Sequence, residues 1–257
     1  MKNQLTFLII LGILAIFISS CSVSTTRIGA INPGYFKNEE EGNVSANVFV
    51  DNKGFGGGVN GNYALSKHGF MALGADFFSA GNAANTKIKN LRVEDIGVKG
   101  FNASLSLGLF NNFGKLNNKY FESSITLIKG WQEFVFPKES GRTNIGLTPT
   151  ALSALVGWGT TQKNVDILGG INLMLSFNNF IGKNGSFNSD INITKENFSC
   201  FSLFFGGRFG RGPIKCSVMT YCAIPSYSFF ETLNPRVNVS LGVHYNFGRI
   251  NSSLTRM

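Results

Sequence analysis

The sequence predicts an all-β protein: an antiparallel up-and-down transmembrane β-barrel of about ten strands. Three observations carry this prediction, namely segments with alternating apolar and polar side chains, connections of alternating length, and a shortage of charged residues. Charged residues make up 14% of the 257 residues, against ~25% in ordinary soluble domains. Because a soluble protein needs a charged surface, this deficit indicates that much of the surface does not meet water.

The segment 236–247, RVNVSLGVHYNF, shows the alternation most clearly. Every second side chain from Val237 to Phe247 is apolar, and those between them are polar or glycine. Side chains alternate faces along a strand, so this segment has one apolar and one polar face. Its length is close to the ~9–11 residues of a tilted membrane-crossing strand. Its apolar face ends with Tyr245 and Phe247, as expected of an aromatic belt at a membrane interface.

Nine further segments repeat this pattern. The ten expected strands are residues 44–51, 58–65, 71–77, 101–110, 121–131, 150–159, 165–178, 201–209, 214–224 and 236–247. After the first hairpin, short and long connections alternate, which is typical of outer-membrane barrels with short periplasmic turns and long outer loops. Eight or twelve strands remain alternatives, because boundaries inferred from one sequence vary by ~2–4 residues.

The polar faces consist mostly of Asn, Ser and Gly. Faces of this kind suit a narrow, hydrogen-bonded lumen better than a surface in water, so we expect the apolar faces to point outward into lipid. In that arrangement Trp131 lies at the outer rim. The alternative is a soluble ligand-binding barrel of the lipocalin kind, which has the opposite facing.

The N-terminus has the pattern of a secretory leader: Lys2 precedes an apolar run that ends at Ile18, and small residues follow. Ile18 to Cys21 resembles the bacterial lipobox, which implies that Cys21 becomes a lipidated N-terminus. We therefore expect four parts, namely a lipoprotein signal peptide at 1–20, a lipidated polar tether at 21–41, an outer-membrane β-barrel at 42–248 and a short C-terminal tail at 249–257.

With these features, residues 21–248 resemble the small lipid-anchored outer-membrane β-barrel proteins of Gram-negative bacteria. The resemblance implies export by a cleaved signal peptide and a location in the cell outer membrane, both lipid-anchored and membrane-spanning. It also implies outer-membrane lipid, lipopolysaccharide and the barrel assembly machinery as partners. Such barrels commonly end on an aromatic residue, whereas here Gly248 to Met257 follow Phe247.

The formal net charge is +9, and Lys2 is the only charged residue before Cys21, so 9 − 1 = 8 positive charges remain after the leader. The basic residues are spread over turns and loops, and no nucleic-acid-binding motif accompanies them. We therefore expect no nucleic-acid partner and favour contact with anionic lipid headgroups.

Charged and titratable residues on the polar faces are candidates for a lumen site. They are Glu122, Asp166, Arg208, Arg236 and His244, together with Asp76 and Lys215. Opposite charges in a narrow barrel most often form ion pairs that plug it, because a lone charge in low dielectric is costly. The same residues could line a selective pore, but ten strands leave little room beyond their side chains.

No catalytic, cofactor or metal site is predicted. Gly56, Gly58 and Gly61 spell GxGxxG, but a strand-like segment follows where a nucleotide loop needs a helix. Ser240 and His244 would lie ~13 Å apart along one strand, beyond hydrogen-bond reach. The three cysteines of the mature chain, Cys200, Cys216 and Cys222, are interpreted as apolar thiols and not as a disulfide or a zinc site.

The expected role is non-enzymatic, namely that of a structural or surface-interaction protein. It would display the long loops 79–97, 132–148 and 179–197, whose Lys, Arg, Asn and Gly residues suit an extracellular polar ligand. The alternatives are a small porin-like channel and, third, an outer-membrane lipid-modifying hydrolase.

Overall fold

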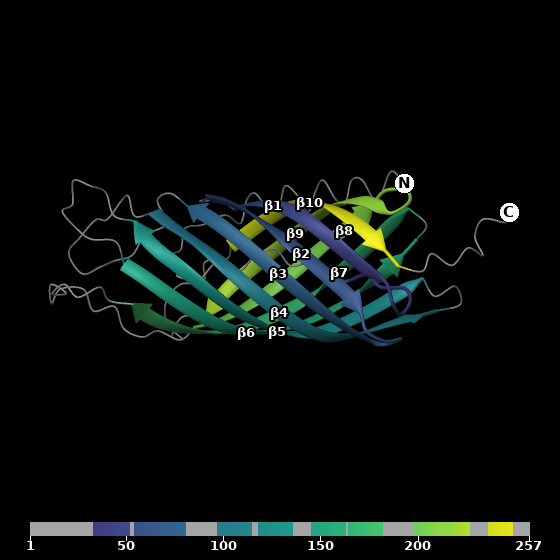
Figure 1. Ribbon diagram of the computed structural model, residues 1–257, viewed down its shortest axis with the longest axis horizontal. Helices are drawn as coiled ribbons and strands as arrows, with labels where there is room; N and C mark the ends of the chain where they lie inside the picture. The colour runs from purple at the N-terminus through teal and green to yellow at the C-terminus, as the bar shows by residue number, and fades with distance from the viewer. Residues whose placement is uncertain are drawn as a thin grey trace.

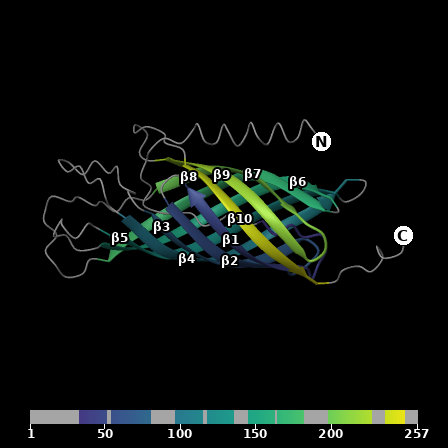
Figure 2. The same ribbon diagram turned by 90° about the horizontal axis from the view of Figure 1, so that it is seen from above.

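The computed structural model is a closed barrel of ten antiparallel strands (Figure 1). It describes residues 33–51, 54–80, 97–114, 118–135, 145–162, 164–181, 198–226 and 236–248. Each strand pairs with the next along the chain, and pairing of the first with the last closes the ring (Figure 2). The predicted fold class is therefore confirmed. The strands are β1 (Gly42–Asp51), β2 (Gly54–Ala64), β3 (Gly69–Ala80), β4 (Gly97–Phe113), β5 (Lys119–Val135), β6 (Ile145–Thr161), β7 (Val165–Ile181), β8 (Phe198–Phe209), β9 (Ile214–Ser226) and β10 (Arg236–Phe247).

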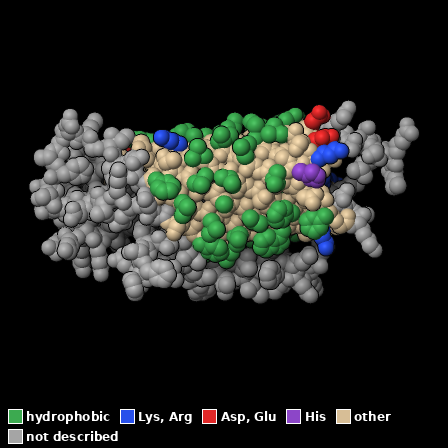
Figure 3. Space-filling model, turned by 90° about the horizontal axis from the view of Figure 1, so that it is seen from below, with side chains coloured by type: hydrophobic (Ala, Val, Ile, Leu, Met, Phe, Trp, Pro, Cys, Tyr) green, Lys and Arg blue, Asp and Glu red, His purple; other side chains and the backbone are tan. Residues whose placement is uncertain are grey.

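The apolar rows of the strands point outward and the polar rows point into the lumen. In β10, Val239, Leu241 and Val243 are exposed while Asn238 and Ser240 are buried. Figure 3 shows apolar side chains over the middle of one face, with charged side chains towards its ends. This facing is the reverse of a lipocalin-type barrel, so the soluble-barrel alternative is wrong. An apolar exterior around a polar interior is the arrangement of membrane-spanning barrels.

The two ends of the barrel differ in their connections. We call the end that carries residues 65–68, 114–118, 162–164 and 210–213 the turn end, and the opposite end the loop end. The connections 81–96, 136–144, 182–197 and 227–235 join strands at the loop end. Gly42 of β1 pairs with Phe247 of β10. The first strand therefore begins, and the last strand ends, at the turn end.

The wall is tallest from β4 to β7, where each strand has 17 residues. At ~3.3 Å per residue and a tilt of ~45° such a strand rises ~40 Å, more than the ~25 Å apolar band of an outer-membrane barrel. The sequence pattern predicted only residues 101–110 for β4, because alternation weakens outside the lipid. At the loop end the outward-facing Lys99 and Glu133 pair at 2.9 Å.

Short turns hold the strands together at the turn end. The amide of Leu65 donates to the carbonyl of Gly69 at 2.8 Å, and the amide of Gly69 donates to the Ser66 hydroxyl at 2.9 Å. In the 210–213 turn, Gly212 has φ +77°, a conformation that favours glycine. No helix in the described part of the chain is long and apolar enough to cross a membrane.

Candidate functional site: the barrel lumen

A segment of the chain itself occupies the lumen at the turn end. Residues 33–36, which precede β1, are all buried inside the barrel mouth, and we call them the plug segment. Phe36 is only 1% exposed. The sequence pattern predicts a polar tether at 21–41, which includes this segment. In the structure Tyr35 and Phe36 are instead buried against the barrel interior, because both carry large apolar rings.

Aromatic rings from the barrel wall receive the plug segment. The Phe36 ring lies 5.3 Å from Phe70 and 5.2 Å from Phe110, measured between centroids. The Tyr35 ring stacks on Tyr120 at 6.0 Å. Such pairs contribute about 0.5–1.5 kcal/mol each beyond the burial of their area. The plug therefore docks through a continuous aromatic cluster.

Hydrogen bonds fix the backbone of the plug segment. The amide of Gly34 donates to Glu122 Oε2 at 3.0 Å, and the Tyr120 hydroxyl donates to the same oxygen at 2.6 Å. Asn43 Nδ2 donates to the Gly34 carbonyl at 2.8 Å, and Asn112 Nδ2 donates to the Phe36 carbonyl at 3.0 Å. Glu122 is therefore a buried acceptor for the plug.

Tyr35 occupies an unusual backbone conformation. Its φ is +52°, in the left-handed region that bulky residues rarely adopt. Such a conformation costs about 1–3 kcal/mol and persists only where surrounding contacts enforce it. The Arg208 guanidinium provides one of these contacts, because it lies 4.0 Å from the Tyr35 ring centroid and donates to the Tyr35 carbonyl at 3.4 Å. Burial also raises the pKa of the Tyr35 phenol well above its usual range.

A cluster of charged side chains, Asp166, Arg208 and Lys215, lies beside the plug segment. Asp166 Oδ2 accepts from Arg208 at 3.2 Å and from Lys215 at 2.5 Å, and Asp166 is fully buried. The three residues come together because β7, β8 and β9 are neighbours. Asp166 is opposite Arg208 in the β7–β8 register, and the short turn 210–213 brings Lys215 of β9 beside them at the turn end. Pairing offsets the desolvation of the buried carboxylate.

His244 does not pair with Ser240. Its Nε2 lies 2.7 Å from Oγ of Ser217, which is on the neighbouring strand β9. The ring Nδ1 has no partner among the described residues, so no carboxylate orients the imidazole. Without such a group the pair lacks the third member of a hydrolytic triad.

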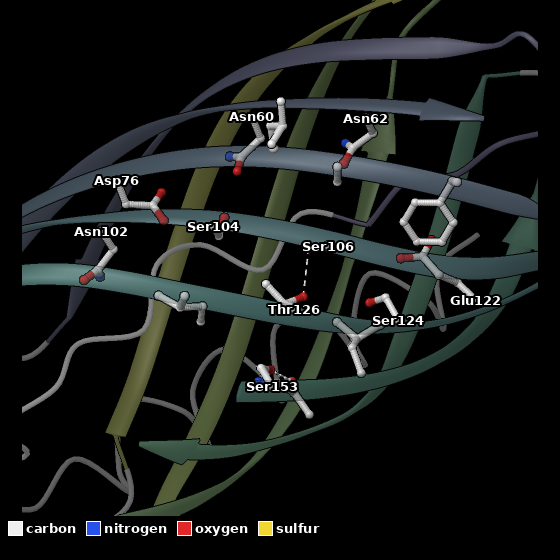
Figure 4. Close-up of a pocket in the computed structure, with 16 residues that line it drawn as sticks. Asn60, Asn62, Asp76, Asn102, Ser104, Ser106, Glu122, Ser124, Thr126 and Ser153 are labelled. Carbon is white, nitrogen blue, oxygen red and sulfur yellow. Dashed lines mark hydrogen bonds between the residues drawn. The ribbon is translucent and has the colours of Figure 1, made fainter. Parts of the chain in front are cut away.

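Above the plug the lumen contains a cavity of about 90 Å³ with a largely polar lining (Figure 4). Asn60, Asp76, Asn102 and Ser104 line it, from the neighbouring strands β2, β3 and β4. On the adjacent wall the Ser106 and Thr126 hydroxyls are 2.8 Å apart, within hydrogen-bond distance. A cavity of this size with polar groups can hold several water molecules.

The structure thus brings five of the predicted lumen residues towards the turn end, namely Glu122, Asp166, Arg208, Lys215 and His244. Arg236 is at the loop end of β10, and its side chain lies outside the described part of the structure, as does Cys21. Among the described residues, no group of three or more His, Cys, Asp or Glu side chains is placed to hold a metal ion.

The three described cysteines are free thiols. Cys200 is buried in the lumen, Cys216 is exposed on the outer face, and Cys222 is partly exposed there. In the β8–β9 register Cys222 is opposite Leu203 and Cys216 is opposite Phe209, so neither is opposite Cys200.

Sequence reasoning missed the plug segment and Ser217. The adjacent rings of Tyr35 and Phe36, directly before the polar run Lys37 to Glu41, are a signal that could have located the plug. Ser217 carries no comparable signal, because its contact with His244 depends on the β9–β10 register.

The fold defined by this topology and facing is that of the outer-membrane β-barrels. No protein-family model matches the sequence, and no curated protein matches it.

Several solved barrels are similar in structure. The translocator domain of the autotransporter NalP from Neisseria meningitidis is 10% identical, and the match covers 83% of this chain and 90% of that one with a TM-score of 0.47. LpxR from Salmonella typhimurium is 8% identical, with 79% and 99% covered and a TM-score of 0.41. The KdgM porin is 8% identical, with 80% and 99% covered and a TM-score of 0.32. Similarity at this level carries no role over to this chain.

Proposed function

We propose that this protein is a closed, non-conducting outer-membrane barrel lipoprotein with a structural or surface-interaction role and no enzymatic activity. The observation that carries the proposal is the burial of Pro33 to Phe36 in the turn-end mouth of the barrel. A barrel that served as an open channel would need a water-filled path through this end. Here aromatic rings and the Asp166 charge cluster occupy it.

The position of the plug also supports anchoring at Cys21. Twelve positions separate Cys21 from Pro33, and an extended chain of that length spans at most ~40 Å. Because Pro33 is at the turn end, a lipid on Cys21 that does not cross the bilayer would lie in the leaflet nearest that end. Short turns face the periplasm in barrels of this fold, so the anchor belongs to the periplasmic leaflet.

The opposite end then faces the outside of the cell. Its connections 81–96, 136–144 and 182–197 combine Lys and Arg with Asn and Gly. This composition suits a polar extracellular ligand or the phosphate and sugar groups of lipopolysaccharide. A barrel that displays these connections at the cell surface needs no open lumen, which agrees with the buried plug segment.

Planar-bilayer recording of the purified full-length chain tests the closed state. Insertion is first verified by resistance to carbonate extraction, and we expect no discrete conductance steps. Steps that change in Asp166→Asn but not in the exposed control Glu39→Gln would instead establish a channel. That result would support the porin-like channel instead. The 90 Å³ lumen cavity, which is lined in part by polar side chains, is the observation that favours this alternative.

Labelling of lysines tests the orientation. An amine-reactive reagent that does not cross the outer membrane should modify Lys138 and Lys195 in intact cells. It should reach Lys37, which is exposed at the turn end, only after permeabilisation. The reverse pattern would contradict the proposed display.

Replacement of Cys21 by Ser tests the anchor. Extraction of the variant barrel from the membrane should still require detergent, while the mass of the attached lipid should be missing from the protein.

The hydrolase alternative rests on the contact between Ser217 and His244. Both side chains face the lumen of a closed barrel, and a membrane lipid would have to enter that lumen to reach them. We expect His244→Ala to leave the lipid composition of the outer membrane unchanged. An altered lipid profile in this variant, with normal barrel insertion, would establish an enzyme.

A further inference from the structure

Among the described lumen side chains, carboxylates outnumber cations by one. The carboxylates are Asp76, Glu122 and Asp166, and the cations are Arg208 and Lys215, so the sum is 2 − 3 = −1 with His244 taken as neutral. Four of these groups lie towards the turn end: Arg208 and Lys215 both pair with Asp166, and Glu122, which also lines the cavity, accepts hydrogen bonds from Gly34 and Tyr120. Asp76 is separate from them, nearer the loop end on β3.

Asp76 is a buried carboxylate without a described partner. It is 7% exposed, and its Oδ1 has no hydrogen-bond partner among the described residues. It lines the 90 Å³ cavity between Asn60 of β2 and Asn102 of β4 (Figure 4). An isolated carboxylate in such a place costs several kcal/mol in lost hydration unless a positive charge compensates it.

Glycines in the wall leave room for the oxygen atoms around this position. The Asp76 carboxylate lies against Gly58, and the Asn60 carbonyl and Ser104 hydroxyl lie against Gly74. A Cβ at either glycine would clash with these oxygens. Asn60 Nδ2 has no partner in the described structure either. The amide is therefore free of contacts that would hold it in one orientation, and its oxygen can turn towards the cavity.

We propose that the cavity binds one small monovalent cation of the sodium type, held by the Asp76 carboxylate with oxygens of Asn60 and Ser104. One carboxylate with neutral amide and hydroxyl oxygens is a hard, all-oxygen ligand set. Asp76 is a single carboxylate without a described cation beside it, which suits a monovalent ion. The remaining cavity volume allows the ion to keep part of its water shell.

Urea unfolding of the full-length protein in lipid vesicles tests the proposal. Choline chloride is replaced stepwise by NaCl at constant total chloride, so that ionic strength does not change. A bound ion lowers the unfolding equilibrium constant by the factor 1 + [Na⁺]/Kd, which is about tenfold at ten times Kd. We expect a saturable effect of this kind in the wild type and in the exposed control Glu39→Gln. Asp76→Asn should abolish it.

Two results would overturn the proposal: no difference between NaCl and choline chloride in the wild type, or the same sodium response in Asp76→Asn. The first would mean that a proton neutralises the carboxyl group. If Asp76→Asn does not fold, Asn60→Ala decides the matter. A weaker sodium response than the wild type supports the site, and an identical response contradicts it.

Discussion

Removal of one ring from the plug should release it from the barrel without unfolding the wall. Phe36→Ala deletes a side chain that is 1% exposed and that contacts Phe70 and Phe110. Loss of a buried phenyl ring costs about 3–5 kcal/mol. Because tenfold in an equilibrium constant corresponds to about 1.4 kcal/mol, the undocked population should rise by about 100- to 4,000-fold, until the plug is fully released.

Hydrogen exchange followed by mass spectrometry measures this change directly. The amides of Gly34 and Phe36 are held by Glu122 and by the Tyr120 hydroxyl, so they exchange only when the plug opens. A peptide that covers residues 34–38 should exchange faster by the same factor in the variant.

The matched control for this prediction is Phe49→Ala. Phe49 is 2% exposed and faces the lumen from β1 near the loop end. Its loss should weaken the barrel by a similar amount but leave exchange of the plug amides unchanged. Equal exchange of residues 34–38 in wild type and Phe36→Ala would refute the reasoning, because it would mean that the plug is not held by this contact.

Two further predictions concern the barrel wall. Asp166→Asn leaves Arg208 and Lys215 buried without their partner, which should lower the free energy of unfolding by about 3–5 kcal/mol; urea unfolding in lipid vesicles measures it, and an unchanged midpoint contradicts the pairing. Leu127→Arg places a charge on the outer face in the middle of β5, where Leu127 is 52% exposed, and should cost about 2–4 kcal/mol. Ile214→Arg, at the turn-end edge of β9, should cost only about 0–1 kcal/mol. Equal costs in the same unfolding assay would mean that no lipid belt surrounds the barrel.

The strands of the wall could be predicted because the alternation of apolar and polar side chains can be read within each strand alone. In β10 each residue from Val237 to Phe247 occupies the face that the alternation assigns to it. The lipid imposes this pattern over the membrane-spanning part of every strand, so boundaries were missed only beyond it. Lys99 and Glu133 show the reason, since outward-facing charges outside the lipid interrupt the apolar row.

The lumen was less predictable because its contacts join distant parts of the chain. Alternation assigns Asp166, Arg208 and His244 to the lumen, but it does not say which of them meet. The pairing of His244 with Ser217 depends on how β9 and β10 are shifted against each other. The plug depends in addition on a segment outside every strand, to which no periodicity rule applies.

The plug contacts also imply an order of events in assembly. Gly34 reaches Glu122 across 88 positions of the chain, and Tyr35 reaches Arg208 across 173. Loop-closure entropy grows slowly with length, by about 0.6 kcal/mol per doubling, so distance along the chain is not the main obstacle. The two partners are on β5 and β8. Going round the barrel from β1, β5 is reached through β2 and β8 through β10, so both surround the same mouth only once β1 has paired with β10. That pairing starts at Gly42, six residues after Phe36, and so brings the plug to the mouth. A proline at Val239, which interrupts the β10 ladder, should therefore abolish protection of the plug amides even where the β4–β7 hairpins have formed.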